Sequence, residues 1–273
     1  MTRFLVVPQW QGSPSARAMR LGDGAHAIAD DLPRSATTVL DVPSEAGESL
    51  GTGLHRLSAL LRTRALVDEA LAPLTEPVLL VGGDCGVSVG AVAHAAAQGN
   101  DLAVVWFDAH PDLHSPETSP SGAFGGMVLR AILGEGVRGL TLEPGLVPPS
   151  RVVLAGTRSF DDAEQEYAAA HALTAVAADA FAEAGSLAGA VRATGAGRVF
   201  VHVDLDVLDP SEISGVTSAQ PFGLTVAQLV AAIGALRAEV PLAGAAITGF
   251  SPSTPAAAID DLGAILRIVG ALA

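Results

Sequence analysis

The sequence has no lysine. Its 15 basic residues are all arginines, and they stand against 29 aspartates and glutamates, which gives a formal net charge of −14 over 273 residues. Without lysine, the chain cannot use Schiff-base catalysis or place a P-loop lysine on a nucleotide phosphate. Because an acidic chain repels phosphate backbones, nucleic acid is also excluded as a partner.

Cysteine and long apolar segments are scarce as well. Cys85 is the single cysteine, so no intrachain disulfide can form. Apolar residues make up 49% of the chain, yet no run of them approaches the roughly 20 residues that span a bilayer. The apolar stretch before Pro8 is too short for the core of a secretion signal. We therefore expect no membrane partner and a cytoplasmic location.

Short apolar segments alternate with helical patterns along the chain. We predict strands at 4–7, 77–81, 102–108, 151–155, 199–206 and 242–250. We predict helices at 58–71, 87–97, 126–133, 162–171, 187–194, 225–238 and 257–272. This alternation is typical of a parallel α/β sheet that helices cover on both faces. Since no Pro- or Ser-rich linker divides the chain, we expect one domain over residues 1–273.

Acidic residues follow two of the predicted strands. Residues 102–107 run into Asp108, His110 and Asp112, and residues 199–203 run into Asp204 and Asp206. In an extended chain, residues two apart point to the same side, so each group presents its side chains together. Buried carboxylates need positive charge, and with no lysine available a divalent metal ion is the natural source. A lone Asp after a strand is more often a turn residue, which is our interpretation of Asp209.

A glycine-rich turn at residues 82–86 carries the cysteine. It follows a predicted strand and precedes a predicted helix, where the helix dipole favours a thiolate. Cys85 therefore has two interpretations: it is a metal ligand, or it is a small buried apolar residue. We expect His94 and His202 to be core or supporting residues rather than ligands.

The order and spacing of these motifs resemble the arginase (ureohydrolase) family. The family signatures Gly-Gly-Asp-His, Asp-Ala-His-x-Asp and Asp-x-Asp-x-x-Asp-Pro correspond to residues 82–85, 108–112 and 204–210. The resemblance implies a three-layer α/β/α fold with a central, mostly parallel sheet. It also implies two Mn²⁺ ions that serve the hydrolysis of a guanidinium group to urea and an amine. The implied ligands are Asp108 and Asp204 as bridges, Asp112 on one ion, His110 and Asp206 on the other, and Cys85 in place of a histidine.

Three positions depart from the family pattern. A thiolate at Cys85 is softer than imidazole and opens the site to zinc, iron or cobalt, although the carboxylates still favour manganese. Gly125 stands where the family has a histidine with a proton-transfer role, which leaves Asp112 as the expected catalytic proton relay. Gly249 stands where the family has a glutamate that pairs with the guanidinium group.

The missing glutamate predicts the substrate. Arginine is a permanent cation and is poorly bound without a pairing carboxylate. The hydroxyl of an N-hydroxyguanidine lowers the pKa of the group, so that a neutral form exists near pH 7. Within the family, the pattern resembles hydrolases that convert Nω-hydroxy-L-arginine to hydroxyurea and L-ornithine for biosynthesis of the antibiotic D-cycloserine. We therefore expect this small-molecule substrate, with poor turnover of L-arginine.

The resemblance also implies a set of residues that hold the amino-acid end of the substrate: His114, Ser119, Ser121, Asp161, Glu164 and Ser218. The alternative is that the serines cap a turn and that Glu164 faces solvent.

Three other functions stay open at this point. The chain could be a ureohydrolase for another guanidino compound such as agmatine, a metal-free hydrolase with Cys85 as nucleophile, or a non-catalytic arginase-like protein. Many arginases are oligomers helped by a C-terminal extension. Because this chain stops directly after its last predicted helix, we expect a monomer.

Overall fold

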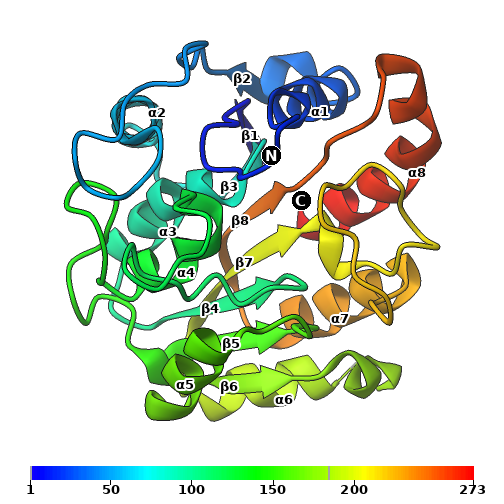
Figure 1. The fold of residues 1–273 in the computed structure, drawn as a ribbon. Coiled ribbons are helices and arrows are strands. Elements are labelled where there is room, and N and C mark those ends of the chain that lie inside the picture. Colours follow the sequence, from blue (N-terminus) through cyan, green and yellow to red (C-terminus); the bar gives the residue numbers. More distant parts are fainter. Residues whose placement is uncertain (1, 184) are drawn as a thin grey trace.

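An eight-stranded sheet runs through the centre of the computed structural model, which describes residues 2–183 and 185–273 (Figure 1). The strands are β1 (Arg3–Val7), β2 (Thr37–Val39), β3 (Val78–Gly82), β4 (Leu102–Phe107), β5 (Val152–Ala155), β6 (Thr174–Val176), β7 (Arg198–Asp204) and β8 (Leu242–Thr248). Their order across the sheet is β2-β1-β3-β8-β7-β4-β5-β6. Every neighbouring pair is parallel, so the sheet that we expected to be mostly parallel is parallel throughout.

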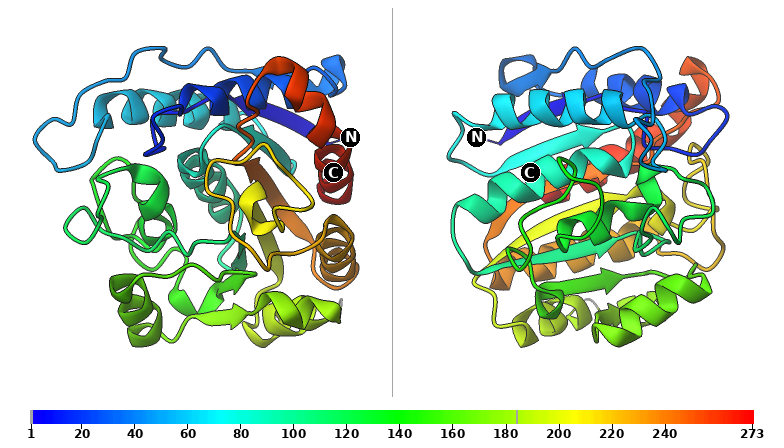
Figure 2. Two further views of the ribbon diagram at one scale, coloured as in Figure 1. Left: turned by 45° about the vertical axis from the view of Figure 1, so that its right-hand side comes forward. Right: turned by 60° about the vertical axis from the view of Figure 1, so that its left-hand side comes forward.

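Helices cover both faces of the sheet (Figure 2). They are α1 (Met19–Ala29), α2 (Leu57–Leu71), α3 (Ser88–Ala97), α4 (Val128–Ile132), α5 (Asp162–Ala170), α6 (Ser186–Ala193), α7 (Val226–Glu239) and α8 (Pro255–Leu272). One apolar core lies between the sheet and α1, α6, α7 and α8, and a second lies between the sheet and α2, α3, α4 and α5. The three-layer α/β/α architecture is thus confirmed. Within the described residues, no helix has both the length and the apolar composition needed to cross a membrane.

The central strands owe their sequence pattern to this double cover. All six residues of β4 are buried, and so are all residues of β7 after Arg198. A strand buried on both faces needs an unbroken apolar run rather than an alternating one. Two of the following helices begin at capping boxes, α5 at Asp161 and α7 at Thr225. These caps satisfy the free N–H groups of the first helical turn and fix where each helix begins.

Three elements lie outside the predicted set: α1, β2 and β6. The two strands have three residues each, lie at the edges of the sheet and are half-exposed, so they carry no apolar run to detect. Helix α1 contains Gly22 and Gly24, which disfavour a helix. Close packing explains Gly24, because a Cβ at this position would lie 2.0 Å from the carbonyl oxygen of Phe250. Three predicted strands also end earlier than expected, at Phe107, Asp204 and Thr248.

This contact generates a prediction on stability. Gly24→Ala should lower the free energy of unfolding by about 1–3 kcal/mol, because α1 must move away from the loop after β8. Gly234→Ala is the matched control, since Gly234 lies in α7 with nothing within 4 Å of its added Cβ. The control should be stabilised by about 0.5–1 kcal/mol through helix propensity. Urea denaturation measures both, and equal shifts in the two variants would contradict the packing argument.

Candidate active site

The residues expected to bind metal come together in one cavity at the carboxyl end of the sheet. Asp108 directly follows β4, Asp204 is the last residue of the neighbouring β7, and Cys85 opens a short 3₁₀ helix after β3. The cavity wall contains all six predicted ligands: Cys85, Asp108, His110, Asp112, Asp204 and Asp206. Loops after parallel strands meet at this edge, which is the usual ligand position in open α/β sheets.

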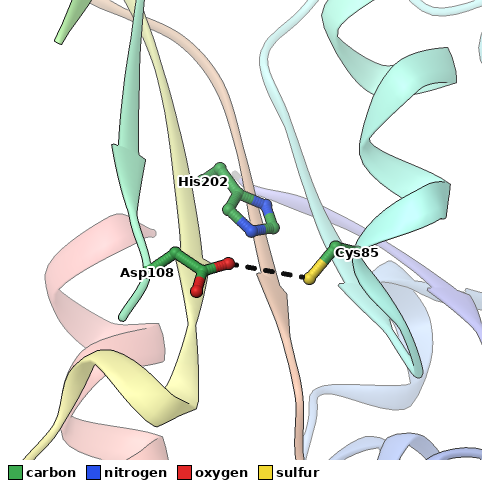
Figure 3. A group of neighbouring side chains, drawn as sticks. All are labelled: Cys85, Asp108 and His202. Carbon is green, nitrogen blue, oxygen red and sulfur yellow. Dashed lines mark hydrogen bonds between the residues drawn. The ribbon is translucent and has the colours of Figure 1, made fainter. Parts of the chain in front are cut away.

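Direct contacts join these side chains into two groups that share Asp108. On one side, the His110 Nδ1 atom lies 3.3 Å from Asp108 Oδ1 and 3.0 Å from Asp206 Oδ2. On the other, the Cys85 Sγ atom lies 4.0 Å from Asp108 Oδ2 (Figure 3). The same sulfur donates to Asp204 Oδ2 at 2.9 Å. A carboxylate that belongs to two neighbouring donor groups is suited to bridge two cations.

Burial has changed the proton affinity of the cluster. It raises the pKa of Asp108 and of Asp112 well above the ordinary range, and with the charge of Asp206 it raises the pKa of Asp204 to about 7. Burial and the charge of Asp204 likewise raise the pKa of the Cys85 thiol. For His110, burial alone lowers the pKa, but the contacts with Asp108 and Asp206 outweigh it and raise the pKa to about 12. Without bound cations, the cluster therefore retains protons on these side chains, and the protons reduce the repulsion between the carboxylates.

Asp112 completes the case for cations at this position. Its side chain is buried, and its Oδ2 atom has no hydrogen-bond partner. Its backbone is left-handed, with φ +53°, a conformation that is uncommon for residues other than glycine. An unpaired buried carboxylate oxygen beside three further carboxylates, an imidazole and a thiol fits a pair of divalent ions.

Two polar anchors that the sequence analysis did not identify hold the ligand loops. Asp84 is buried and accepts hydrogen bonds from Gln9 Nε2 and from the backbone N–H groups of Gly12 and Gly86, at 2.8–2.9 Å. These bonds fix the turn that carries Cys85. Burial raises the pKa of Asp84 to about 6.

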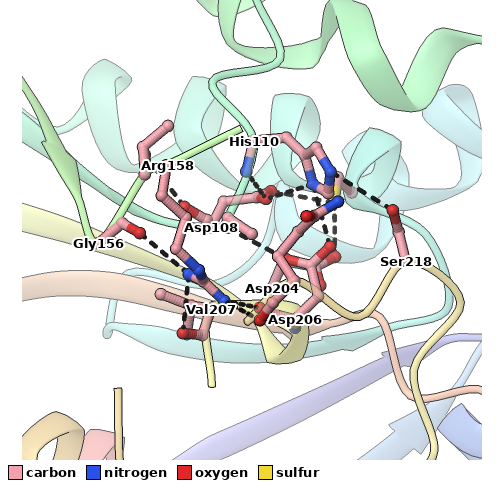
Figure 4. Close-up of polar contacts among 12 residues, drawn as sticks. Asp108, His110, Gly156, Arg158, Asp204, Asp206, Val207 and Ser218 are labelled. Carbon is pink, nitrogen blue, oxygen red and sulfur yellow. Dashed lines mark hydrogen bonds and ion pairs between the residues drawn. The ribbon is translucent and has the colours of Figure 1, made fainter. Parts of the chain in front are cut away.

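Arg158 is the second anchor (Figure 4). Its guanidinium donates to backbone carbonyl oxygens on both sides of the cavity, those of Gly156, Asp206, Val207, Leu208, Gln220 and Pro221. The residue thereby joins the loop after β5, the loop after β7 and the segment that follows Ser218. Its only signal in the sequence is its position after a predicted strand.

The residues expected to recognise an amino acid form a cluster of their own. The His114 Nε2 atom lies 3.0 Å from Asp161 Oδ2 and 3.8 Å from Glu164 Oε1. Glu164 is buried rather than solvent-facing, and it accepts hydrogen bonds from the N–H groups of Leu113 and Asp161. His114 and Glu164 line the same cavity as the carboxylate cluster, whereas Asp161 lies outside its wall.

The three predicted serines differ in their positions. Ser121 and Ser218 line the cavity, and Ser119 does not. Ser119 and Ser121 also cap their own turn, since their Oγ atoms accept hydrogen bonds from the N–H groups of Gly122 and Ala123. The Ser218 Oγ atom lies 3.4 Å from His110 Nε2. Asp209 is a turn residue as predicted, because its carboxylate accepts from Ser211 and Gly223.

Two glycines line the cavity where the family pattern has functional side chains. The Gly125 N–H donates to the carbonyl oxygen of Gly12 at 2.7 Å. Gly249 has a left-handed backbone, φ +87°, and a Cβ there would lie 2.3 Å from Asp204 Oδ1. Any residue with a side chain at position 249 would therefore clash with Asp204 unless Asp204 moves.

Comparison with known proteins agrees with this geometry. The family model "Arginase family" matches residues 23–266. The chain belongs to the arginase family. It is 33% identical to the arginase of Bacillus caldovelox over 203 residues, which cover 68% of this chain and 67% of that protein.

Other relatives match over shorter segments or in fold alone. The arginase of Staphylococcus aureus (strain MRSA252) is 32% identical over 154 residues, 54% of this chain and 51% of that protein, so the match spans about half of its length. The crystal structure of Entamoeba histolytica arginase in complex with L-ornithine superposes with a TM-score of 0.86 at 19% identity, and covers 100% of this chain and 99% of that one.

The expected bridging role of Asp204 generates a prediction on metal content. Asp204→Asn should lose at least one of two bound Mn²⁺ ions and more than about 100-fold of the activity, since even residues behind metal ligands contribute 10–100-fold. Asp209→Asn is the control, because the same change five residues later touches only a turn. Metal analysis after dialysis against Mn²⁺ measures occupancy, and equal losses in the two variants would overturn this division of roles.

The raised pKa values generate a second prediction. Cys85 and His110 hold protons at pH 7, so Mn²⁺ binding to the apoprotein should release at least about two protons per chain. Because protons compete with the ion, the affinity should rise as the pH increases from 6 to 8. Calorimetric titration in two buffers of different ionisation enthalpy counts the protons. A pH-independent affinity without proton release would show that these side chains are not ligands.

Proposed function

We propose that this chain is a binuclear, manganese-dependent amidinohydrolase that cleaves Nω-hydroxy-L-arginine to hydroxyurea and L-ornithine and turns over L-arginine poorly. The observation that carries the choice of substrate is Gly249. It leaves the cavity wall beside Asp204 without the carboxylate that would pair with a guanidinium cation.

The remaining acids of the cavity do not replace that carboxylate. Among the described residues, the acids that line the cavity are the four of the cluster, Asp84 and Glu164. Asp84 accepts three hydrogen bonds from protein groups, and Glu164 belongs to the separate cluster around His114. A guanidinium in this cavity would lose a charge-assisted hydrogen bond of about 1.5–3 kcal/mol, roughly 10- to 150-fold in affinity. A neutral N-hydroxyguanidine does not require that partner.

The side chains of the cluster would hold the metal ions, and Asp112 would in addition move a proton. When bound, two Mn²⁺ ions would lower the pKa of water and so supply a nucleophile at neutral pH. Cys85, Asp108, His110, Asp112, Asp204 and Asp206 would hold them. The water oxygen forms a bond to the hydroxyguanidine carbon, and the bond from that carbon to the ornithine side-chain nitrogen breaks. Asp112, whose Oδ2 atom has no hydrogen-bond partner in the protein, would carry the proton from water to the departing amine.

The second cluster supports an α-amino acid substrate. Asp161 and Glu164 place two carboxyl groups beside His114, and such a site favours an α-ammonium group. Ser121 lines the cavity together with His114 and Glu164 and is available for the α-carboxylate. Agmatine has no α-carboxylate, so this arrangement gives it fewer partners than an amino acid.

Cys85 is poorly suited to be a nucleophile. A thiol attacks as its thiolate, and burial together with three neighbouring aspartates raises the pKa of this thiol. The position favours a thiolate only when cations compensate the carboxylates. This argues against a metal-free cysteine hydrolase.

The proposal predicts a preference among three substrates. With Mn²⁺ present, kcat/KM for Nω-hydroxy-L-arginine should exceed that for L-arginine by more than the roughly 10- to 150-fold of a single lost contact, since the substrate hydroxyl adds its own interaction with the metal pair. Agmatine should be poorer still. Detection of hydroxyurea identifies the product. Equal kcat/KM for Nω-hydroxy-L-arginine and L-arginine would contradict the proposed specificity and indicate an ordinary arginase.

Recognition of the α-ammonium group has its own test. Asp161→Asn should lower kcat/KM for Nω-hydroxy-L-arginine about 10-fold or more through a higher KM, because it removes one negative charge. The melting temperature should change little, since asparagine caps helices as well as aspartate does. Asp162→Asn is the control: this carboxyl is exposed on the next residue and has no contact with His114. Identical kinetics in the two variants would remove Asp161 from the site.

A further inference from the structure

His202 is a buried imidazole with one nitrogen unused by the protein. It lies on β7 two residues before Asp204, so that both side chains point to the same face of the sheet. The residue is 0% exposed, and its ring stacks on Trp106 with 3.6 Å between ring centroids and an interplanar angle of 14°. Its Nδ1 atom lies 2.9 Å from Ser88 Oγ, while its Nε2 atom has no hydrogen-bond partner.

The free side of this ring faces the metal-donor cluster. Ligand atoms of His202, Cys85 and Asp108 all lie within 4.8 Å of one another. Figure 3 shows the imidazole beside the line that joins the Asp108 carboxylate to the Cys85 sulfur, with a nitrogen directed towards it. Donors that share one ion at 2.0–2.3 Å are at most about 4.4–4.6 Å apart, so an ion between these three side chains needs only small adjustments.

A buried imidazole nitrogen without a partner is unfavourable, and the stacking on Trp106 prevents the ring from turning towards another one. When Nδ1 carries the proton and donates it to Ser88, the lone pair of Nε2 is directed at Cys85 and Asp108. Hydrogen bonding of the second ring nitrogen is the usual way in which a protein fixes the orientation of a histidine ligand.

We propose that His202 is a further ligand of the cation held by Cys85 and Asp108, with Ser88 as the residue that orients it. The inference rests on the binuclear centre of the proposed function and deepens it. The ion near Cys85 would then have an imidazole ligand from β7 in addition to the thiolate and the carboxylates. The expectation that His202 is a core or supporting residue would be wrong.

The first test measures metal affinity rather than activity. His202→Phe keeps an aromatic ring against Trp106 and removes the nitrogen donor. Titration of the apoprotein with Mn²⁺ or Co²⁺ should show the dissociation constant of one of the two ions raised at least about 10- to 100-fold, with the other ion less affected. His94→Phe is the matched control, because His94 is a half-buried histidine of α3 that contacts Gln98 outside the cavity wall. It should leave both dissociation constants unchanged.

A spectroscopic readout separates direct ligation from support. In pulsed electron paramagnetic resonance of the Mn²⁺ protein, the imidazole nitrogen signal should correspond to two histidines in the wild type and to one in His202→Phe. Ser88→Ala retains the imidazole and removes only the hydrogen bond that orients it, so it serves if the phenylalanine variant folds poorly. We expect it to raise the same dissociation constant several-fold.

The outcomes distinguish this inference from the proposed function. Two tightly bound ions in the wild type with unchanged affinities in His202→Phe and Ser88→Ala would overturn the ligand assignment and leave the amidinohydrolase proposal intact. A changed sulfur-to-cobalt absorption band with unchanged affinity and nitrogen signal would make His202 a hydrogen-bond partner of Cys85 only, which also overturns it. If the wild type binds no ion pair, both proposals fail together.

Discussion

Strands β4 and β7 end side by side, and their sequences deliver carboxylates to a largely buried edge where little water can solvate them. Several neighbouring side chains compensate this concentration of negative charge. His110 lies between Asp108 and Asp206, and the thiol of Cys85 donates to Asp204. Arg158 gives its hydrogen bonds to carbonyl oxygens and none to the carboxylate side chains, so these carboxylates still require cations. The scaffold thus holds the ligand loops without neutralising the ligands.

The two ends of the cavity are built on different elements, and Glu164 links them. Its carboxylate completes the capping box of α5 and also accepts from the N–H group of Leu113, which directly follows Asp112. The position of helix α5 is therefore coupled to the loop after β4, and a residue that caps a helix also lines the substrate cavity. Such double use explains how recognition groups can keep a fixed distance from the reacting centre although they lie on a loop and a helix rather than on the sheet.

The sequence predicted most of the fold because the central strands are unbroken apolar runs separated by helical patterns. It failed at β2 and β6, whose three residues carry too little pattern, and at α1, where Gly24 serves a contact 226 positions away with Phe250. The predicted ligands are brought together because period-two spacing follows directly from strand geometry. Arg158 and the orientation of His202 could not be predicted, since both depend on which strands become neighbours, a property of the whole sheet and not of any one segment.

Gly249 has an evolutionary consequence. A new side chain at this position meets Asp204 at once, and the left-handed backbone opposes every residue other than glycine. An arginine-pairing acid therefore cannot return by a single replacement, because the first step damages the centre that makes the chain an enzyme. Compensating changes in the backbone around β8 would have to come first, without any gain in activity to select them. Under the proposed function, a lineage with this geometry cannot easily regain guanidinium substrates, and its members should retain a preference for the hydroxylated substrate even where arginine is abundant.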